Sequence, residues 1–413
     1  MRMIARKILP LSLLVTCAAT VFGQSQGEFA HRFQVKPSPT IVHGTPSAIP
    51  PATLVTNSLL PVWNYQVISS RDGNVYEGVI VGHNPQTMGS HSGVSVTTQV
   101  VPIILKFQSV ATSVNLTTGI ITTTNGSATS NPLAHDTGCF TGNDNIPLEL
   151  LAQSPMFQNA DFNFGGTDVG TTQYTDAFQR ANFWSEIDKS NYHVRLGPLQ
   201  ILKPVVLTVP ASLGLSLPAN IFEPTFSMCG PEGIVDINVI DTLAVNELSK
   251  LPGVTPGTFP MFMIYNTGMS FGDPKNLANC CAGGYHSVNP VSPLTFQTYS
   301  PFDFDVSGFF VSSANDTAIV SHEAAEWMND PYIANATPAW GHTGQVTGCQ
   351  NNLEVGDPLT GFLAPPIAMP NGYTYHLQEL AFFSWFFGAP SLGIHGWYSD
   401  NATFLTDAGP VCQ

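Results

Sequence analysis

The chain has 413 residues, of which 43% are hydrophobic and only 10% are charged. This composition can build one large or two medium domains, and it excludes a disordered chain or a coiled coil. The formal net charge of −15 makes nucleic acid and anionic lipid poor partners, because both are themselves negatively charged.

The first 23 residues predict a secretory signal peptide. Three basic residues among the first seven precede an apolar run from Ile8 to Val21, and Gly23 is small enough for a cleavage site. A lipoprotein signal that ends at Cys17 is the alternative. Cleavage after residue 23 would take the net charge from −15 to −18, since residues 1–23 hold three basic and no acidic residues. We therefore expect a secreted or periplasmic protein, and no later apolar run is long enough for an integral membrane protein.

Residues 24–55 are proline-rich and predict an extended linker or surface strap. Ordered structure then begins with a predicted hairpin over residues 62–82, whose two β-rich runs flank the turn Asp72-Gly73. Residues 96–110 are nearly continuously apolar, which predicts a strand buried on both faces. The Thr-rich residues 116–130 predict a polar hairpin at a sheet edge.

Helices and strands alternate through the rest of the chain. Helices are predicted where apolar residues recur at helical spacing, and the last of them is apolar nearly all round, so it should be buried. The predicted helices cover residues 146–157, 172–187, 239–251 and 375–387, and the predicted strands cover residues 199–210, 259–267 and 302–313. This order favours a single α+β domain with a mixed β-sheet over residues 56–413.

Six cysteines remain after cleavage of the signal peptide: Cys139, Cys229, Cys280, Cys281, Cys349 and Cys412. An even number in an exported chain favours disulfides, and six cysteines allow fifteen pairings. We expect the adjacent Cys280 and Cys281 to bond to two different partners. A thiolate zinc site is the alternative, but the chain contains no C-x-x-C pair.

The stretch SHEAAEWMNDP, which ends at Pro331, predicts a helix. Residues 318–328 hold no helix breaker, and Ser313 with Asp316 three residues later resembles a capping box. Pro331 ends the helix because proline cannot continue the hydrogen-bond ladder.

This helix carries the residues with chemistry. His322 and Glu326 are four residues apart, so they stack on one face and can hold one metal ion. Glu323 lies beside the first ligand, where a carboxylate can act as a general base. The pattern resembles the HExxH-type zinc metallopeptidases, in which both histidines bind zinc and the first glutamate is the base. The resemblance implies a zincin-like active-site helix, a zinc cofactor, a peptide or protein substrate and catalysis by Glu323.

The pattern departs from that family at Glu326, which replaces the second histidine, so the motif here is HExxE. A carboxylate still binds zinc, but its negative charge weakens the activation of water and suits Ca²⁺ or Mn²⁺ better than a second histidine does. A third ligand must come from elsewhere, and Glu354 and Asp357 in NNLEVGDP are the best candidates. Four histidines are weaker candidates: His286, His342, His376 and His395.

A second resemblance covers roughly residues 260–360. The order HEAAE, Asn329-Asp330-Pro331, Trp340 and Glu354 to Asp357 is similar to that of the phosphate-induced (Exordium-like) extracellular proteins. The adjacent cysteines, followed by Gly284-Tyr285-His286, are similar as well. This resemblance implies export and a metallopeptidase-like fold rather than a particular activity.

A triplet of the aspartic proteases also occurs, at Asp136-Thr137-Gly138. That chemistry needs two such loops whose aspartates share a proton. The chain holds no second copy, so the triplet does not predict a protease of that class.

Three functions are compatible with the sequence, which leaves open whether the chain is an enzyme. The first is a secreted metal-dependent hydrolase, in the simplest case a zinc peptidase. The second is a non-catalytic extracellular or cell-wall glycan-binding protein, for which the C-terminal third offers aromatic residues: Trp385, Phe386, Phe387, Trp397 and Tyr398. The third is a structural calcium site built from Glu326, Glu354 and Asp357.

Overall fold

The computed structural model describes residues 41–42, 59–87, 93–136, 138–140, 145–187, 190–310, 314–343, 349–410 and 412. The predicted signal peptide, nearly all of the proline-rich segment and Ser313 of the predicted capping box lie outside these residues. Among the described helices, none is both long and apolar enough to cross a membrane.

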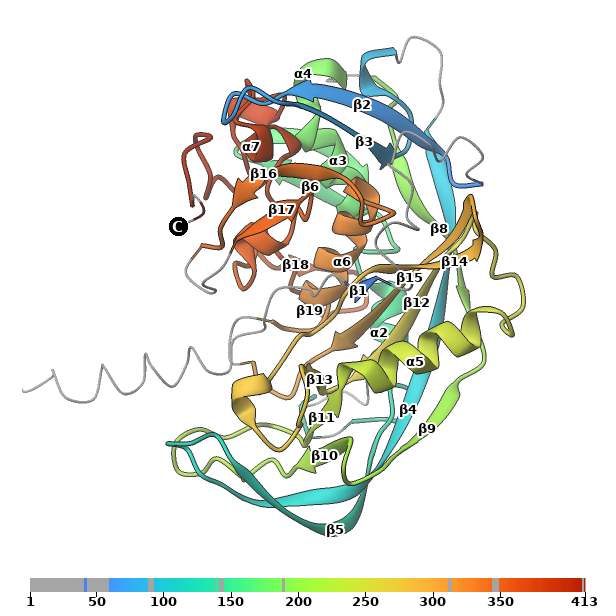
Figure 1. Cartoon of the computed structure of the whole chain (residues 1–413), viewed down its shortest axis with the longest axis vertical. Coiled ribbons are helices and arrows are strands. Elements are labelled where there is room, and N and C mark those ends of the chain that lie inside the picture. The colour runs from blue at the N-terminus through green and yellow to red at the C-terminus, as the bar shows by residue number, and fades with distance from the viewer. Residues whose placement is uncertain are drawn as a thin grey trace, which may run out of the picture.

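The described chain has a mixed α+β architecture built around one long strand, β4 (Val94–Val114). The first half of β4 pairs in parallel with β8 (Val194–Ile201) and β12 (Phe259–Tyr265). Its second half pairs in parallel with β9 (Val205–Val209) and antiparallel with β5 (Ile121–Ser130). Figure 1 shows β4 running along one side of the molecule while the sheet curls around it.

The main path of the sheet runs in the order β1-β14-β15-β12-β4-β10-β11-β13. Within it β15 is parallel to β12 and antiparallel to β14, and β11 is parallel to β13 and antiparallel to β10. The remaining strands of this path are β1 (Ile41–Val42), β10 (Gly214–Leu217), β11 (Glu232–Asp236), β13 (Thr267–Ser270), β14 (Ser287–Ser292) and β15 (Thr295–Phe304).

Short strand pairs and helices complete the described structure (Figure 1). The strand pairs are β2 (Val62–Ile68) with β3 (Val75–Val81), β6 (Ala160–Phe164) with β7 (Thr167–Thr172), β16 (Ala336–Trp340) with β17 (Gln350–Asn352), and β18 (Ile367–Ala368) with β19 (Thr374–Tyr375). The α-helices are α2 (Pro147–Gln153), α3 (Tyr174–Asn182), α4 (Trp184–Ile187), α5 (Ile237–Leu248), α6 (Ala318–Asn329) and α7 (Phe383–Phe387).

Two helices cover opposite faces of the sheet. α5 shares one apolar cluster with Val101 of β4 and Phe262 of β12, whereas α6 shares the other with Val100 and Met261. Neighbouring residues of a strand point to opposite faces, so the two helices lie on opposite sides. The prediction that residues 96–110 are buried on both faces is therefore confirmed for the first half of β4. The second half alternates instead, with Lys106 exposed.

The helix α6 is buried along its whole length, and the predicted helix over residues 318–328 is confirmed. Ala324 and Ala325 are both 0% exposed and let the helix lie close to the sheet. Trp327 stacks on Phe259 of β12 with the ring centroids 3.9 Å apart. This packing holds the polar face of α6 in a fixed position beside β15, which the helix contacts.

Some predicted elements are interrupted. The hairpin over residues 62–82 is confirmed as β2 and β3, and the Thr-rich stretch forms β5. Residues 199–210 form two strands because Pro204 cannot donate to the ladder. Residues 172–187 form α3 and α4, which are separated at the non-helical Phe183. Residues 302–313 continue as a strand only to Phe304, after which Asp305 accepts the backbone N–H of Ser307 in a turn.

The predicted helix over residues 375–387 is wrong, since only α7 at its end is helical. The preceding backbone donates to distant partners: Glu379 N–H to the Phe362 carbonyl and Ala381 N–H to the Val355 carbonyl, each at 2.8 Å. Long-range pairing of this kind overrides local periodicity. The prediction that the segment is buried is confirmed, because Phe386 and its neighbours are 0% exposed.

The six cysteines form three disulfides: Cys139–Cys229, Cys349–Cys412 and Cys280–Cys281. Disulfide pairing is therefore confirmed, and no sulfur of the six is left for a thiolate zinc site. The prediction that Cys280 and Cys281 bond to different partners is wrong. They pair with each other, and the other four cysteines form the remaining two bonds.

Candidate metal centre

The helix α6 places His322 and Glu326 side by side, as their spacing predicts. His322 Nε2 lies 3.0 Å from Glu326 Oε1. His322, Glu323 and Glu326 are only 4%, 1% and 0% exposed. Three ionisable side chains on one helix turn are thus buried together, and buried charged groups need ion pairs, hydrogen bonds or a metal to offset the loss of water.

The segment after β17 brings both predicted third ligands to this face. Asp357 Oδ1 lies 3.3 Å from His322 Nε2. Glu326 Oε1 accepts the backbone N–H groups of Gly356 and Asp357, each at 3.1 Å. Glu354 is 3% exposed and reaches the same cluster from the other side. The sequence interpretation of NNLEVGDP as the partner of the helix is therefore supported by its position.

The structure adds His286, which the sequence interpretation ranked among the weaker candidates. This residue directly precedes β14, and its Nδ1 lies 3.6 Å from Glu326 Oε2 and 3.9 Å from Glu323 Oε2. Its Nε2 lies 3.7 Å from Glu354 Oε2 and 3.1 Å from the backbone carbonyl of Asp330. The sequence signal for His286 was its place after the adjacent cysteines in the Exordium-like resemblance.

The other three histidines lie in different surroundings. His376 Nδ1 pairs with Asp316 Oδ2 at 2.7 Å, just before α6. His342 Nδ1 lies 3.0 Å from the backbone carbonyl of Asp357, and His395 is exposed and contacts the Phe164 carbonyl at 3.1 Å. Among the described residues, none of these three histidines belongs to a group of side chains spaced to hold a metal ion.

Hydrogen bonds orient both imidazole rings of the centre. The Gln378 amide donates to the Gly356 carbonyl at 2.6 Å, so its oxygen faces His322 Nδ1 at 2.9 Å. With the Nδ1 proton donated to Gln378, His322 presents Nε2 to the cluster. His286 presents Nδ1 in the same way when Nε2 donates to the Asp330 carbonyl. Such outer contacts are typical of metal-binding histidines, and sequence reasoning missed Gln378 because its segment was predicted as helix.

Two glycines let the backbone approach these side chains closely. A Cβ added at Gly356 would lie 2.6 Å from the His322 ring, and one at Gly284 would lie 2.6 Å from Glu323 Oε1. Either side chain would displace a member of the cluster. The space around His322 and Glu323 therefore depends on the absence of a side chain at both positions.

Burial and charge act in opposite directions on these groups. Burial alone would lower the pKa of His322, but Glu326 and Asp357 raise it well above its ordinary value. Burial would also lower the pKa of His286, but Glu326 and Glu323 raise it. Burial would raise the pKa of Glu326, but the two histidines bring it down to about 2. For Glu354, burial and then the charge of Glu326 raise the pKa well above its usual range. A bound cation would replace the protons held on these groups.

The distances from His286 to the neighbouring carboxylates fit a shared ion better than hydrogen bonds. His286 Nδ1, Glu326 Oε2 and Glu354 Oε2 are buried and have no hydrogen-bond partner among the described residues. Two ligands that each lie about 2.1 Å from zinc are about 3.4 Å apart at the tetrahedral angle. The separation of 3.6 Å between His286 Nδ1 and Glu326 Oε2 is close to that value. Glu326 belongs to both possible ligand groups, one with His286 and Glu354 and one with His322 and Glu323.

The aromatic residues proposed for glycan stacking have a different role. Trp385, Phe386 and Phe387 are 0% exposed, so they belong to the core and cannot present a stacking surface. Trp397 and Tyr398 are half-buried. The triplet at Asp136 is also accounted for locally, because its carboxylate accepts the Gly138 N–H at 2.7 Å and the Tyr265 hydroxyl; Thr137 lies outside the described residues.

No protein-family model, curated protein or solved structure shows significant similarity to this chain. The resemblances to HExxH peptidases and to Exordium-like proteins therefore stay predictions from the sequence. What the chain itself supplies is a buried cluster of two histidines and four carboxylates around α6.

Proposed function

We propose that the chain is a metal-dependent hydrolase that acts on peptide bonds, with its centre on α6. The observation that carries the proposal is the convergence of His286, Glu354 and Asp357 on His322 and Glu326. These residues come from three separate parts of the chain. Glu326 joins two groups that could each hold a cation, one with His286 and Glu354 and one with His322 and Glu323. The proposed export of the protein rests on residues 1–23 alone.

The donor set favours zinc over calcium. Calcium in proteins is bound by oxygen atoms, whereas zinc is commonly held by imidazole nitrogen together with carboxylate oxygen. The centre places His286 Nδ1 beside Glu326 Oε2 and His322 Nε2 beside Glu326 Oε1. A calcium site built from Glu326, Glu354 and Asp357 would place these two nitrogens beside the ion without using them.

When bound, a zinc ion would polarise the scissile carbonyl and lower the pKa of water. The carboxylate of Glu323 would accept the proton of the attacking water, since it lies next to His322 in sequence and faces His286 at 3.9 Å. Burial of this carboxylate strengthens its electrostatic interaction with a charged transition state. Glu326 would hold the cation together with either His286 and Glu354 or His322, and these residues would not take part in proton transfer.

A cavity lies at the start of α6, and no residue of the α6 centre lines it. It has a volume of about 350 Å³ and is lined by Asp316, Tyr373 and His376, among others. Asp316 accepts from His376 Nδ1 at 2.7 Å, which leaves Nε2 as a donor when the ring is protonated. The pKa of His376 is raised by this hydrogen bond to Asp316.

A peptide is the substrate class favoured by the neighbouring sheet edge. β14 begins directly after His286, and its outer side pairs in parallel with the short strand β1. Residues Ile41 and Val42 lie opposite Ser287 and Val288. A segment of the chain itself thus covers this edge, and a peptide substrate would have to replace β1 to pair with β14 by backbone hydrogen bonds.

A purely structural metal site is the second candidate, and one observation favours it. The side chains of the centre are 0–4% exposed, and closed sites with a full set of protein ligands are typical of structural zinc. Such a site would hold the segment around Glu354 against α6 without turnover. The two candidates differ in what Glu323 does, because a structural site does not need a general base.

The test is zinc content measured by elemental analysis together with hydrolysis of a mixed peptide library. It compares residues 24–413 of the natural chain with Glu323→Gln and His322→Ala. We expect about one zinc per chain in the natural protein and in Glu323→Gln. We expect activity to fall about 10²- to 10⁴-fold in Glu323→Gln, the usual contribution of a general base. His322→Ala should lose both zinc and activity.

The matched control is His395→Asn, which changes an exposed histidine that is not part of the α6 centre. Its backbone has a positive φ of 57°, and asparagine tolerates that conformation. Full zinc with no hydrolysis in the natural protein would support the structural site instead. A protein without zinc in every variant would exclude both candidates.

A further inference from the structure

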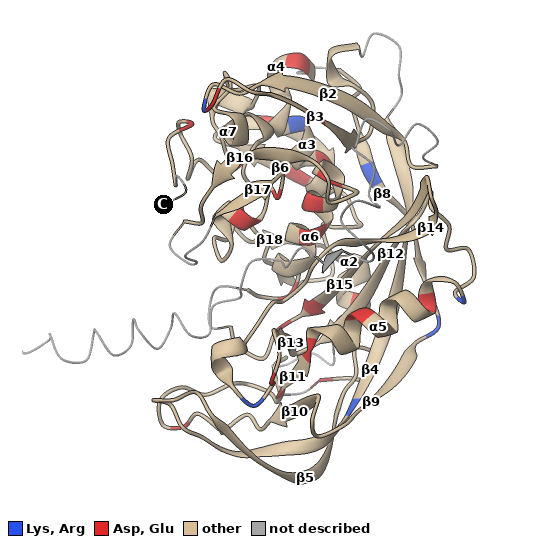
Figure 2. Ribbon diagram, viewed as in Figure 1, with Lys and Arg blue, Asp and Glu red and all other residues tan. Residues whose placement is uncertain are grey.

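A second group of buried carboxylates lies away from the α6 centre, where β11, β13 and β15 meet. Glu232 is the first residue of β11, Asp303 is the penultimate residue of β15, and Asp305 follows that strand. They are 1%, 0% and 0% exposed. One oxygen from each side chain lies within 4.8 Å of the others. Figure 2 shows acidic positions on the ribbon beside β11 and β13 as well as on α6.

The described residues give these carboxylates no positive partner. Among the described residues, no Lys, Arg or His lies within ion-pairing distance of Glu232, Asp303 or Asp305. Burial and then the neighbouring aspartates raise the pKa of Glu232 well above its usual range, and burial raises that of Asp305 to about 6. Three acids in one buried place are unfavourable when ionised, unless a cation or shared protons offset their charge.

The aspartates are held so that one oxygen of each stays free. Thr267 N–H donates to Asp303 Oδ1 at 3.1 Å, and Ser307 N–H donates to Asp305 Oδ1 at 2.8 Å. The other oxygens, Asp303 Oδ2 and Asp305 Oδ2, have no hydrogen-bond partner among the described residues, and neither does either oxygen of Glu232. Four buried carboxylate oxygens thus lie in the cluster, with Ser307 and the Gly268 backbone near enough to Glu232 to lower its pKa. Backbone amides fix Asp303 and Asp305 from behind.

The surrounding backbone is firmly connected. Gly233 N–H donates to the Asn266 carbonyl at 2.7 Å, and Val306 N–H donates to Asn266 Oδ1 at 2.9 Å. Cys229, three residues before Glu232, is bonded to Cys139 and donates its N–H to the Ser307 carbonyl at 2.9 Å. The strands that carry the three acids are therefore joined independently of any ion, so the carboxylates are placed in advance.

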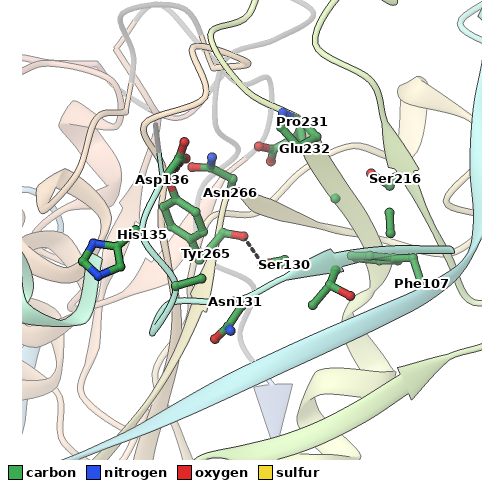
Figure 3. A pocket seen from close by; sticks show the side chains of 14 residues that line it. Phe107, Ser130, Asn131, His135, Asp136, Ser216, Pro231, Glu232, Tyr265 and Asn266 are labelled. Atoms are coloured by element: carbon green, nitrogen blue, oxygen red, sulfur yellow. Dashed lines mark hydrogen bonds between the residues drawn. The ribbon is translucent and has the colours of Figure 1, made fainter. Parts of the chain in front are cut away.

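Glu232 also lines a cavity of about 280 Å³, together with Asp136, Tyr265 and Asn266. Figure 3 shows this wall and the hydrogen bond from Ser130 to the Tyr265 carbonyl. A cavity of that size holds several water molecules. Of the three acids, only Glu232 lines this cavity, and water in it could add ligands from that side.

We propose that Glu232, Asp303 and Asp305 form a second cation site, selective for a hard divalent ion such as Ca²⁺. Calcium takes six to eight oxygen ligands, of which this cluster offers about four and the cavity can supply the rest as water. Mg²⁺ requires a tighter octahedron of oxygens than a bidentate glutamate gives. The site is independent of the α6 centre, because it shares no residue with it and contains no nitrogen ligand.

The experiment titrates Ca²⁺ into metal-free full-length mature protein, followed by calorimetry and by thermal unfolding. The same titration is run after one equivalent of zinc has been added, so that the α6 centre does not contribute. We expect one Ca²⁺ per chain and a rise in Tm in both preparations, with Mg²⁺ binding more weakly. Asp305→Asn and Glu232→Gln should each lose this binding, whereas the exposed Asp168→Asn should bind as the natural chain does.

Two results would overturn the proposal. The first is the absence of heat and of any Tm change on adding Ca²⁺ to the natural chain, which would mean that shared protons alone neutralise the cluster. The second is unchanged Ca²⁺ binding in both Asp305→Asn and Glu232→Gln. Both substitutions remove a charge and keep the side-chain shape, so the variants should fold, and circular dichroism checks this.

Discussion

The α6 centre and the carboxylate cluster at β11 and β15 are both buried and acidic, but they are neutralised differently. In the α6 centre, Glu326 contacts His322 at 3.0 Å and accepts two backbone N–H groups. In the second cluster, Asp303 and Asp305 each accept one backbone N–H, and no cationic side chain of the described chain approaches them. Removing a charge should therefore destabilise the first and stabilise the second when no metal is present.

The largest effect is expected from His322→Ala. The substitution leaves Glu326 buried without its closest counter-charge, which should lower the free energy of unfolding of the metal-free protein by about 3–5 kcal/mol. Asp305→Asn should have the opposite sign, because it relieves repulsion with Glu232. Urea unfolding of both metal-free variants at pH 7 measures the two changes. The comparison fails if both variants lose stability to a similar extent.

The pH dependence of stability should also differ in sign between the regions. Burial raises the folded-state pKa of Asp305 to about 6, so its contribution is complete below about pH 4 and is lost as the pH rises through 6. The loss is on the order of 2–3 kcal/mol in the metal-free protein. The histidines lower the pKa of Glu326 to about 2, so its contribution is present above about pH 4.5 and lost as the pH falls through 2.

Unfolding free energies measured from pH 2 to pH 8 separate these contributions. Asp305→Asn should flatten the decline above pH 4, and Glu326→Gln should flatten the decline at the acidic end. Saturating Ca²⁺ should remove the Asp305 effect without changing the other. A natural chain whose stability is unchanged between pH 4 and pH 7 would contradict the assignment for Asp305.

Two glycine substitutions should affect the regions separately. A Cβ at Gly356 would lie 2.6 Å from the His322 ring, and one at Gly233 would lie 2.6 Å from the Phe107 ring. Each alanine variant should lose about 1–3 kcal/mol of stability through overpacking. Gly356→Ala should weaken zinc binding and leave Ca²⁺ binding intact, and Gly233→Ala should do the reverse. Calorimetric titrations with both ions check this, and loss of both ions in either variant would mean that the sites are coupled.

The smallest effect is expected at Gln378, which orients His322 without belonging to the ligand group. Gln378→Leu removes the acceptor at 2.9 Å from His322 Nδ1. Zinc affinity should fall about 10- to 100-fold, or about 1.4–2.7 kcal/mol. Gln378→Glu keeps an acceptor oxygen and should recover part of the loss. Competition with a chelator measures each affinity, and a value for Gln378→Leu equal to that of the natural chain would exclude the orienting role.

The α6 centre was partly predictable because its core is local. His322, Glu323 and Glu326 occupy one helix turn, and helical geometry places them together without knowledge of the rest of the fold. Glu354 and Asp357 could be proposed because they follow the helix closely in an acidic stretch. His286 could only be ranked low, since its place beside Glu326 depends on where β14 joins the sheet.

The carboxylate cluster shows the opposite case. Asp303 and Asp305 are two residues apart, but Glu232 lies about seventy residues earlier in the chain, and no motif joins them. Their proximity follows from the parallel pairing of β11 with β13 and of β12 with β15. Strand pairing over such distances is decided by the whole sheet, so a local pattern carries no signal for it.

The sequence by itself determined the α6 helix, the face of it that carries His322 and Glu326, the β2–β3 hairpin and the apolar strand β4. Each depends on residues within a few turns or on a simple periodicity. The tertiary structure alone decided that Cys280 pairs with Cys281 and that residues 376–382 are extended rather than helical. It also decided that His286 lies beside Glu326 and that Glu232 lies beside Asp303 and Asp305. These outcomes depend on which distant backbone groups and side chains are available as partners, and only the folded chain specifies that.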